Sequence, residues 1–106
     1  MYCMTITYPK TDDSSFDTDY FRNTHLPLCA RLLAEFGYRG MVLRENQGRE
    51  PDSGDLNYAS LDILFDNADQ MRAGLADSDE KLAADVANYT NVEPQMVFGE
   101  VDLRLD

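Results

Sequence analysis

The residue with the clearest potential for chemistry in this sequence is His25, the only histidine among 106 residues. An imidazole ring can accept or donate a proton near neutral pH, so histidine is a frequent general acid or base. A lone histidine on an apolar helix face is also commonly a hydrogen-bonded residue of the core. A catalytic role and a structural role for His25 therefore both stand at this point.

The pattern around His25 predicts a helix from about Thr18 to Phe36. Asp17 is a suitable N-cap, because its carboxylate can accept hydrogen bonds from the free N–H groups of the first turn. Pro27 disfavours regular helical geometry at the preceding residue, so we expect the helix to kink or pause beside His25. At about 100° per residue, one apolar face collects Phe21, His25, Leu28, Cys29, Leu32 and Phe36, with Leu33 at its edge.

Tyrosine hydroxyls are a second source of chemistry, because they can donate a hydrogen bond to a developing enolate oxygen. Tyr89 lies in the apolar stripe of a second predicted helix, with Leu82 and Val86, and is the first candidate for this role. Tyr8 and Tyr58 lie on predicted strands. They are weaker candidates, since either could serve the core or an interface instead.

The two cysteines, Cys3 and Cys29, do not have the spacing of a metal site, and one histidine is too few to complete a zinc ligand set. We therefore expect no metal. Cys29 follows His25 by one helical turn and could act as a nucleophile, although a buried thiol without a cationic neighbour is inert. Small buried thiols in a reducing compartment are the simpler interpretation.

The chain is strongly acidic, with 20 Asp and Glu residues against 9 Lys and Arg residues and a formal net charge of -11. Such a chain repels phosphate backbones, anionic membranes and phosphorylated cofactors, so we do not expect nucleic acid as a partner. A neutral or apolar small ligand fits the charge. The sequence shows neither a charged-then-apolar leader nor an apolar run of membrane-spanning length, so we expect a cytoplasmic protein without a membrane partner.

Four strands and two helical regions are predicted along the chain. The second helical region begins at an Asp66 or Asn67 cap, is weakened by Gly74 and starts afresh at Asp77, where Glu80 could complete a capping box. The predicted strands are Tyr2–Tyr8, Tyr38–Glu45, Tyr58–Asp66 and Gln95–Leu105. In the third strand, one face should pack on the helices: Ala59, Leu61, Ile63 and Phe65.

This order, β-α-β-β-α-β, predicts a single domain over residues 1–106 with an α+β, ferredoxin-like fold. Both helices should lie on one face of a four-stranded antiparallel sheet. The other face carries a mixture of polar residues and apolar ones such as Leu64. A partly apolar open face calls for a second sheet, so we expect a homodimer with two-fold symmetry.

Several motifs resemble those of the EthD family, and the resemblance extends over essentially the whole chain. The motifs are Tyr8-Pro9, the stretch from Phe16 to Phe21 leading to Thr24-His25-Leu26-Pro27-Leu28, Leu64-Phe65-Asp66, and the stretch from Asp85 to Pro94. The resemblance implies an EthD-like domain of the dimeric α+β barrel superfamily. The family is named for a small protein encoded with an ethyl tert-butyl ether degradation system.

The positions that match the family motif are Asp17, Tyr20, His25, Pro27, Asp85, Tyr89 and Pro94. The resemblance implies catalytic roles for His25 and Tyr89, in a cleft between the helices and the sheet. It implies substrate contacts for Tyr20, and more weakly for the strand residues Tyr8 and Tyr58. We expect Asp85 to be structural, bonded to the backbone or to a neighbouring tyrosine.

Fungal relatives that carry the domain act as dehydratases or decarboxylases on aromatic polyketides, which implies a small hydrophobic or aromatic ligand here. We expect isomerisation, dehydration or cyclisation by proton transfer at His25. We expect no cofactor, since the sequence has no phosphate-cradling glycine-rich loop to hold a nicotinamide. Two alternatives stand beside this hypothesis: a non-catalytic dimeric carrier that uses the same pocket, and haem binding through the helix histidine.

Overall fold

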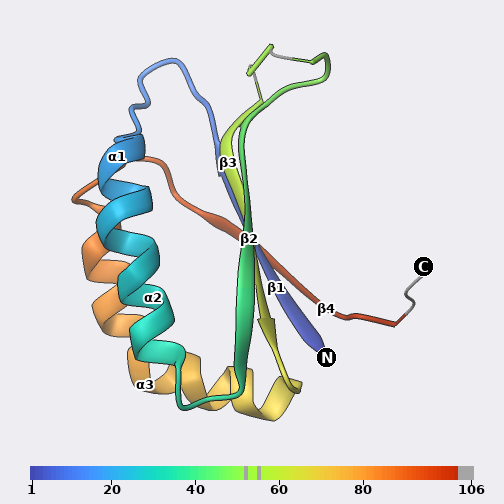
Figure 1. Cartoon of the computed structure of the whole chain (residues 1–106). Helices are drawn as coiled ribbons and strands as arrows, with labels where there is room; N and C mark the ends of the chain where they lie inside the picture. The colour runs from blue at the N-terminus through green and yellow to red at the C-terminus, as the bar shows by residue number, and fades with distance from the viewer. Residues whose placement is uncertain (52, 55, 103–106) are drawn as a thin grey trace.

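Four strands form one antiparallel sheet in the order β2-β3-β1-β4 (Figure 1). The computed structural model describes residues 1–51, 53–54 and 56–102. Its strands are β1 (Tyr2–Pro9), β2 (Tyr38–Gln47), β3 (Asn57–Phe65) and β4 (Gln95–Glu100). The ferredoxin-like α+β prediction is confirmed. The last strand ends at Glu100 instead of Leu105, and residues 103–105 of the prediction lie outside the described residues.

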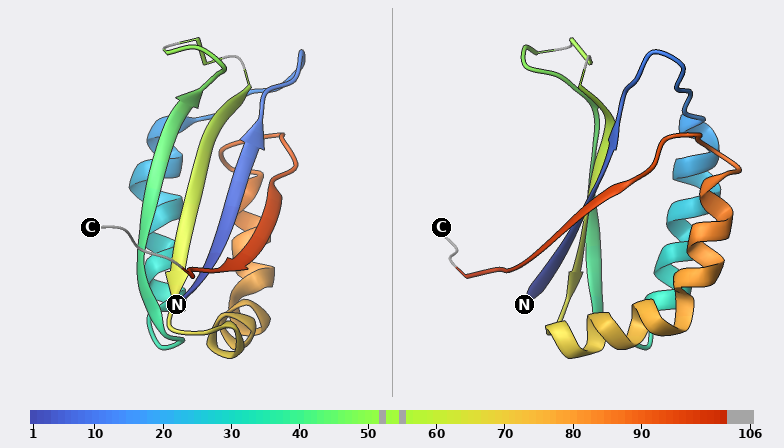
Figure 2. Two further views of the ribbon diagram at one scale, coloured as in Figure 1. Left: turned by 90° about the vertical axis from the view of Figure 1, so that its right-hand side faces the viewer. Right: turned by 180° about the vertical axis from the view of Figure 1, so that it is seen from behind.

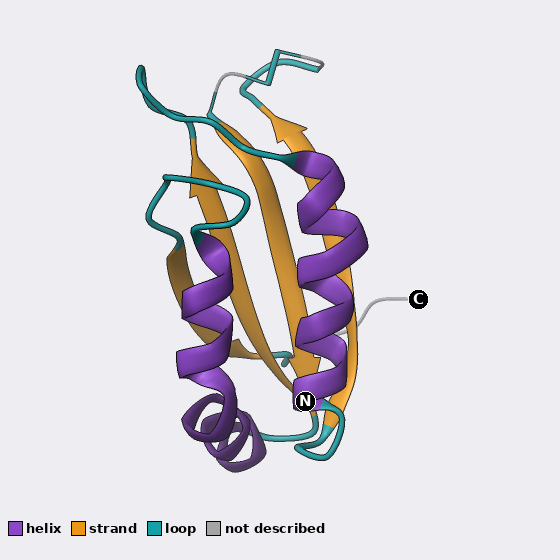
Figure 3. Cartoon of the chain, turned by 90° about the vertical axis from the view of Figure 1, so that its left-hand side faces the viewer, coloured by secondary structure: helices purple, strands orange, loops and turns teal. Residues whose placement is uncertain are grey.

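The core lies between this sheet and the helices, because side chains alternate between the two faces of each strand. The predicted inward set of β3 is confirmed: Ala59, Leu61, Ile63 and Phe65 are each at most 1% exposed. In the neighbouring strand β1, Met4 pairs with Ile63, Ile6 with Leu61 and Tyr8 with Ala59, so their side chains lie on the same face. Figure 3 shows the helices lying across this face, and the left view of Figure 2 shows no helix on the other face.

The first helical region consists of three consecutive segments: α1 (Thr18–Tyr20), the π-helical turn η1 (Phe21–His25) and α2 (Leu26–Leu33). The predicted irregularity beside His25 is therefore present, as a π turn. The helix ends at Leu33 and not at Phe36. Leu33, predicted at the edge of the apolar stripe, is fully buried, because the π turn adds a residue and changes the register of the helix after it.

Helix α3 (Ala68–Val86) is continuous, so the predicted second start at Asp77 is wrong. The cap at Asn67 is confirmed, since its side chain accepts a hydrogen bond from the N–H of Gln70. Figures 1 and 2 show that the helix axis instead turns between its first and second parts. Two small buried residues, Gly74 and Ser78, bring α3 close to the first helix, and the Ser78 hydroxyl donates to the Leu32 carbonyl at 3.4 Å.

Within the described residues, no helix combines the length and the apolar character needed to cross a membrane.

Candidate functional site

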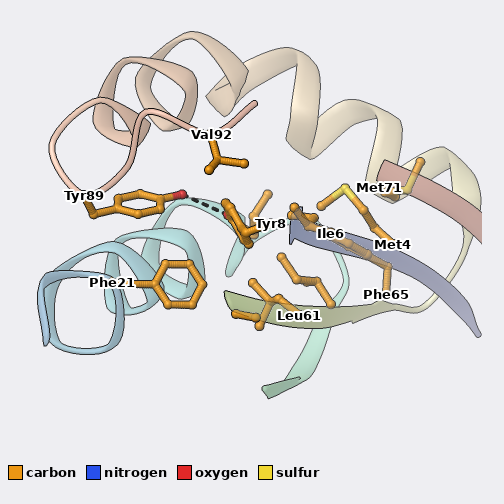
Figure 4. Packing of buried hydrophobic residues seen from close by; sticks show 12 residues of the cluster. Met4, Ile6, Tyr8, Phe21, Leu61, Phe65, Met71, Tyr89 and Val92 are labelled. Atoms are coloured by element: carbon orange, nitrogen blue, oxygen red, sulfur yellow. Dashed lines mark hydrogen bonds between the residues drawn. The ribbon is translucent and has the colours of Figure 1, made fainter. Parts of the chain in front are cut away.

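The residues predicted to carry chemistry meet where the end of β1 approaches the first helix and the end of α3. Figure 4 shows Tyr89 reaching from beyond α3 toward Tyr8, with Phe21 beside them. Two backbone contacts hold this corner together: the N–H of Asp17 donates to the carbonyl of Tyr89 at 2.7 Å, and Phe16 forms an isolated β-bridge with Thr90. The start of the first helix and the end of α3 are therefore fixed relative to each other.

His25 is buried, with only 4% of its surface exposed, and its two ring nitrogens have different surroundings. Nδ1 lies 2.8 Å from Oδ2 of Asp85. Nε2 makes no hydrogen bond within the described residues. The ring is held by Phe21, stacked at 5.8 Å between centroids, and by Tyr89 at 4.6 Å.

Asp85 is the centre of the polar network, and its two oxygens have separate partners. Oδ2 faces His25, whereas Oδ1 accepts from the Tyr20 hydroxyl at 2.7 Å and from the Asn88 amide at 3.0 Å. Burial opposes ionisation of Asp85, but the hydrogen bonds from His25, Tyr20 and Asn88 outweigh it and lower the pKa of the carboxyl. An ionised carboxylate can only accept, so Nδ1 of His25 carries the hydrogen of this bond, and in the neutral ring Nε2 is then the nitrogen with the lone pair.

A cavity of about 230 Å³ lies between the sheet and helices α2 and α3, with His25 in its wall. Its polar lining consists of His25, Tyr8 and the exposed Asp79. The remaining lining is apolar or weakly polar: Met4, Ile6, Cys29, Ile63, Leu75, Leu82, Ala83, Val86, Pro94 and Met96. An apolar pocket with few polar groups is typical of a small-molecule site.

Tyr8 and Tyr89 form a buried pair whose hydroxyl oxygens lie 2.9 Å apart. They are 1% and 3% exposed, respectively. Burial raises the pKa of Tyr8 to about 12, and it raises the pKa of Tyr89 as well. Both phenols therefore keep their protons at neutral pH and can donate. Tyr8 lines the cavity, whereas Tyr89 contacts it only through Tyr8 and the ring of His25.

The structure brings four of the five predicted residues together: His25, Tyr89, Tyr8 and Tyr20. Tyr20 lies outside the cavity lining, with its hydroxyl on Asp85. Tyr58 is separated from the cluster: its ring stacks on Phe16 at 5.1 Å, and its hydroxyl is 2.8 Å from that of Ser14. It therefore packs at the end of the sheet, where the register shift beside Pro9 interrupts the strand alternation.

The alternative nucleophile, Cys29, lies in the cavity wall and is buried. Burial, followed by the nearby Asp85 charge, raises the pKa of its thiol to about 12. The thiol is therefore protonated at neutral pH and a poor nucleophile.

Asp85 has a more specific role than the sequence indicated. We expected a structural residue bonded to the backbone or a tyrosine; it does bind Tyr20, but it also orients the only histidine. The sequence feature that indicates a contact between Asp85 and the site is its spacing from Tyr89. Residues four apart share a helix face, and Tyr89 is predicted to point inward.

No protein-family model matches the sequence, and no curated protein matches it. Among solved structures, an EthD-like protein from Ralstonia eutropha JMP134 superposes with a TM-score of 0.86 at 21% identity, covering 98% of this chain and 94% of that one. SnoaB, a cofactor-independent oxygenase from Streptomyces nogalater, superposes at 0.67 with 12% identity over 98% and 95% of the two chains. A dimeric ferredoxin-like protein from an uncultured marine organism superposes at 0.60 with 9% identity over 100% and 99%. At these identities the chain shares the fold of the three proteins.

Proposed function

We propose that this protein binds a small, uncharged, largely apolar molecule in the cavity and that His25 moves a proton of that molecule without a cofactor. One observation carries the proposal: Nδ1 of His25 is held 2.8 Å from Asp85, Nε2 makes no hydrogen bond within the described residues, and the side chain lines an apolar cavity. A fixed tautomer with a free lone pair is what a general base requires.

The reaction follows from the positions of three groups. Nε2 removes a proton from a carbon next to a carbonyl; the C–H bond breaks, its electron pair forms an enolate and the proton resides on the imidazole. Tyr8, whose side chain lines the cavity, donates a hydrogen bond from its protonated hydroxyl to the enolate oxygen, and Tyr89 positions Tyr8. Return of the proton to another atom completes an isomerisation; in a dehydration the imidazolium instead gives the proton to a hydroxyl on the next carbon, the C–O bond breaks as the enolate collapses to the alkene, and water leaves.

The charge of the protein limits the ligand. Asp79 is an exposed carboxylate in the lining of the cavity, and the whole chain carries a net charge of -11. Anionic ligands are repelled, whereas neutral phenols and enolisable ketones are not. The likeness to an EthD-like protein over nearly the full chain supports membership of the EthD family, and the likeness to a cofactor-independent oxygenase is in keeping with a cofactor-free site.

The assembly we propose is a homodimer of the dimeric α+β barrel type, formed through the open face of the sheet. Val42 and Val97 are 51% and 64% exposed on this face, and Leu64 lies between their strands. The fold is shared with a protein described as dimeric. We place the protein in the cytoplasm, since the unpaired thiols of Cys3 and Cys29 suit a reducing compartment.

The proposal is tested by proton exchange and by ligand-induced stabilisation. Neutral phenols, quinones and cyclic ketones are screened for a rise in Tm, and each enolisable hit is followed by NMR for loss of its α-proton in D2O. Wild type should exchange the proton, and His25→Gln should bind the hit but exchange it about 100-fold or more slowly. Tyr58→Phe, which alters a tyrosine outside the cavity, is the matched control and should exchange like wild type.

The alternative function is a non-catalytic carrier, favoured by the mostly apolar lining of the cavity. If wild type and His25→Gln both bind the ligand but neither exchanges its α-proton with D2O, the result would support the carrier and overturn the catalytic proposal. A His25→Gln variant that melts far below wild type without ligand would show that the imidazole serves the core.

A further inference from the structure

The π-helical turn η1 places one extra residue in the helix directly before the cavity. Its closing bond runs from the N–H of Leu26 to the carbonyl of Phe21, five residues earlier, where an α-helix would use four. His25 is the last residue of this turn. The inference drawn from it rests on the proposed role of His25 as a base.

The buried positions of the helix show what the extra residue does. Phe21, His25, Cys29 and Leu33 are buried, at a constant spacing of four. In a regular α-helix each step of four residues advances the face by about 40°, so Phe21 and Leu33 would diverge by about 120°. Both are 0% exposed, so the π turn has absorbed most of that difference.

The core alone does not require the extra residue. If the chain had one residue fewer between Phe21 and His25, Cys29 and Leu33 would follow Phe21 by seven and eleven positions. In a regular α-helix they would lie within about 20° on either side of Phe21. His25 would then be about 60° away from Phe21, instead of stacked against it.

Besides His25, the turn has one polar side-chain contact within the described residues, an ion pair at 3.2 Å between the exposed Arg22 and Glu45, and such a pair contributes little. Asn23 and Thr24 are exposed, and neither side chain is hydrogen-bonded within the described residues. Pro27 lowers the free-energy cost of the π turn. It has no N–H to donate to the carbonyl of Asn23, so one backbone hydrogen bond of a regular α-helix would be missing there in any case.

We propose that η1 is a one-residue insertion that positions the catalytic base: it rotates His25 toward Asp85 and the cavity while the core on either side keeps its packing. Asn23 and Thr24 contribute the extra residue that shifts the helix register, and their side chains are not needed for contacts. The π turn thus serves to orient one side chain, that of His25.

Two deletion variants test this, one lacking Asn23 and one lacking Thr24, with Asn23→Ala as the control of unchanged length. Because the chain has one histidine, a long-range 1H–15N spectrum reports its ring alone. Wild type and the control should show the Nδ1–H tautomer. Both deletion variants should retain the wild-type far-UV spectrum and cooperative melting but show the tautomer mixture of an unrestrained imidazole, as Asp85→Asn also should.

A wild-type His25 spectrum in the deletion variants would overturn the proposal, because the register would not depend on the extra residue. Failure of both deletion variants to fold would also overturn it, because the core would then need that residue. The readout needs no ligand, so this result is separate from the ligand screen: the positioning can be correct even if no exchange is found, and the reverse also holds.

Discussion

The two sides of the sheet each contain an aspartate-centred cluster, and the clusters differ in what surrounds them. On the helix side, Asp85 binds His25, Tyr20 and Asn88 beside an apolar cavity. On the open side, Asp62 accepts from Thr5 at 2.7 Å and pairs with Arg44 at 3.4 Å. Figure 2 shows that no helix covers this second face.

The comparison shows that an aspartate with good hydrogen bonds is not by itself a site. Asp62 is compensated by a cation in a partly solvated setting, where such a pair contributes little. Asp85 uses its charge to fix the tautomer of a ring whose other nitrogen is free. The Asp85 cluster differs in the adjoining cavity and in the ring nitrogen of His25 that makes no hydrogen bond within the described residues.

The largest expected difference between the two faces is in core packing. Leu61→Ala removes a side chain that is 0% exposed and should cost about 2–5 kcal/mol of unfolding free energy. Leu64→Ala, three residues along the same strand but on the half-buried open face, should cost about 1 kcal/mol or less at low protein concentration. Urea unfolding measures both; equal losses would show that the open face is packed as tightly as the core.

The second expected effect concerns the proposed dimer. Val97→Lys places a charge on the open face and should weaken self-association by about 100-fold or more, since the charge would be buried without a partner. Ala76→Lys, exposed on α3, adds the same charge away from the sheet and should leave association unchanged. Analytical ultracentrifugation across a concentration series measures the dimer dissociation constant. A Val97→Lys dimer as tight as that of wild type would exclude the open face as the dimer interface.

Two glycines give a smaller contrast. A Cβ at Gly74 would lie 3.0 Å from Cβ of Phe36 and 3.1 Å from Cδ2 of Leu33, so Gly74→Ala should lose about 1–2 kcal/mol by overpacking the contact between helices. A Cβ at Gly99 meets nothing within 4 Å, so Gly99→Ala should be neutral or slightly stabilising in the monomer. Thermal melts of both variants test this, and a stabilised Gly74→Ala variant would mean that the two helices separate at little cost.

The smallest expected effect is at alkaline pH. Tyr8 has a pKa of about 12 in the folded protein against 10.0 for an ordinary tyrosine, so between these values the unfolded chain loses its proton first. Stability from this group is complete below pH 10 and falls as the pH rises, by at most about 1.4 kcal/mol per pH unit. Urea unfolding at pH 9 and pH 11 should show a shallower decline in Tyr8→Phe; an identical decline would contradict the raised pKa.

The sheet was predictable from the sequence because strand alternation has a fixed period of two. Every second residue from Ala59 to Phe65 is apolar and buried, and this inward set was predicted correctly even though Leu64 makes the opposite face partly apolar. The helix caps at Asp17 and Asn67 were predictable for a similar reason, since capping depends on one local side chain. Local rules of this kind need no knowledge of the partner elements.

The errors arose where distant packing overrides a local rule. The stripe calculated at about 100° per residue placed Leu33 at its edge, because nothing in the sequence marks a π turn except Pro27. The helix start predicted at Asp77 failed because Ser78 packs against Leu32 and the helix continues past it. The role of Asp85 depended on a pairing across 60 residues, which a single sequence does not display.

The polar cluster also has a consequence for the order in which the chain acquires its structure. His25 and Asp85 are 60 residues apart in sequence, and Tyr8 and Tyr89 are 81 apart, so each contact closes a loop that spans most of the chain. Closing a long loop costs conformational entropy before the contact stabilises it, so we expect these contacts to form after local helices and hairpins. The proton transfer proposed for His25 would therefore be unavailable to a partly folded chain, and its recovery after dilution from denaturant should mark the completion of folding.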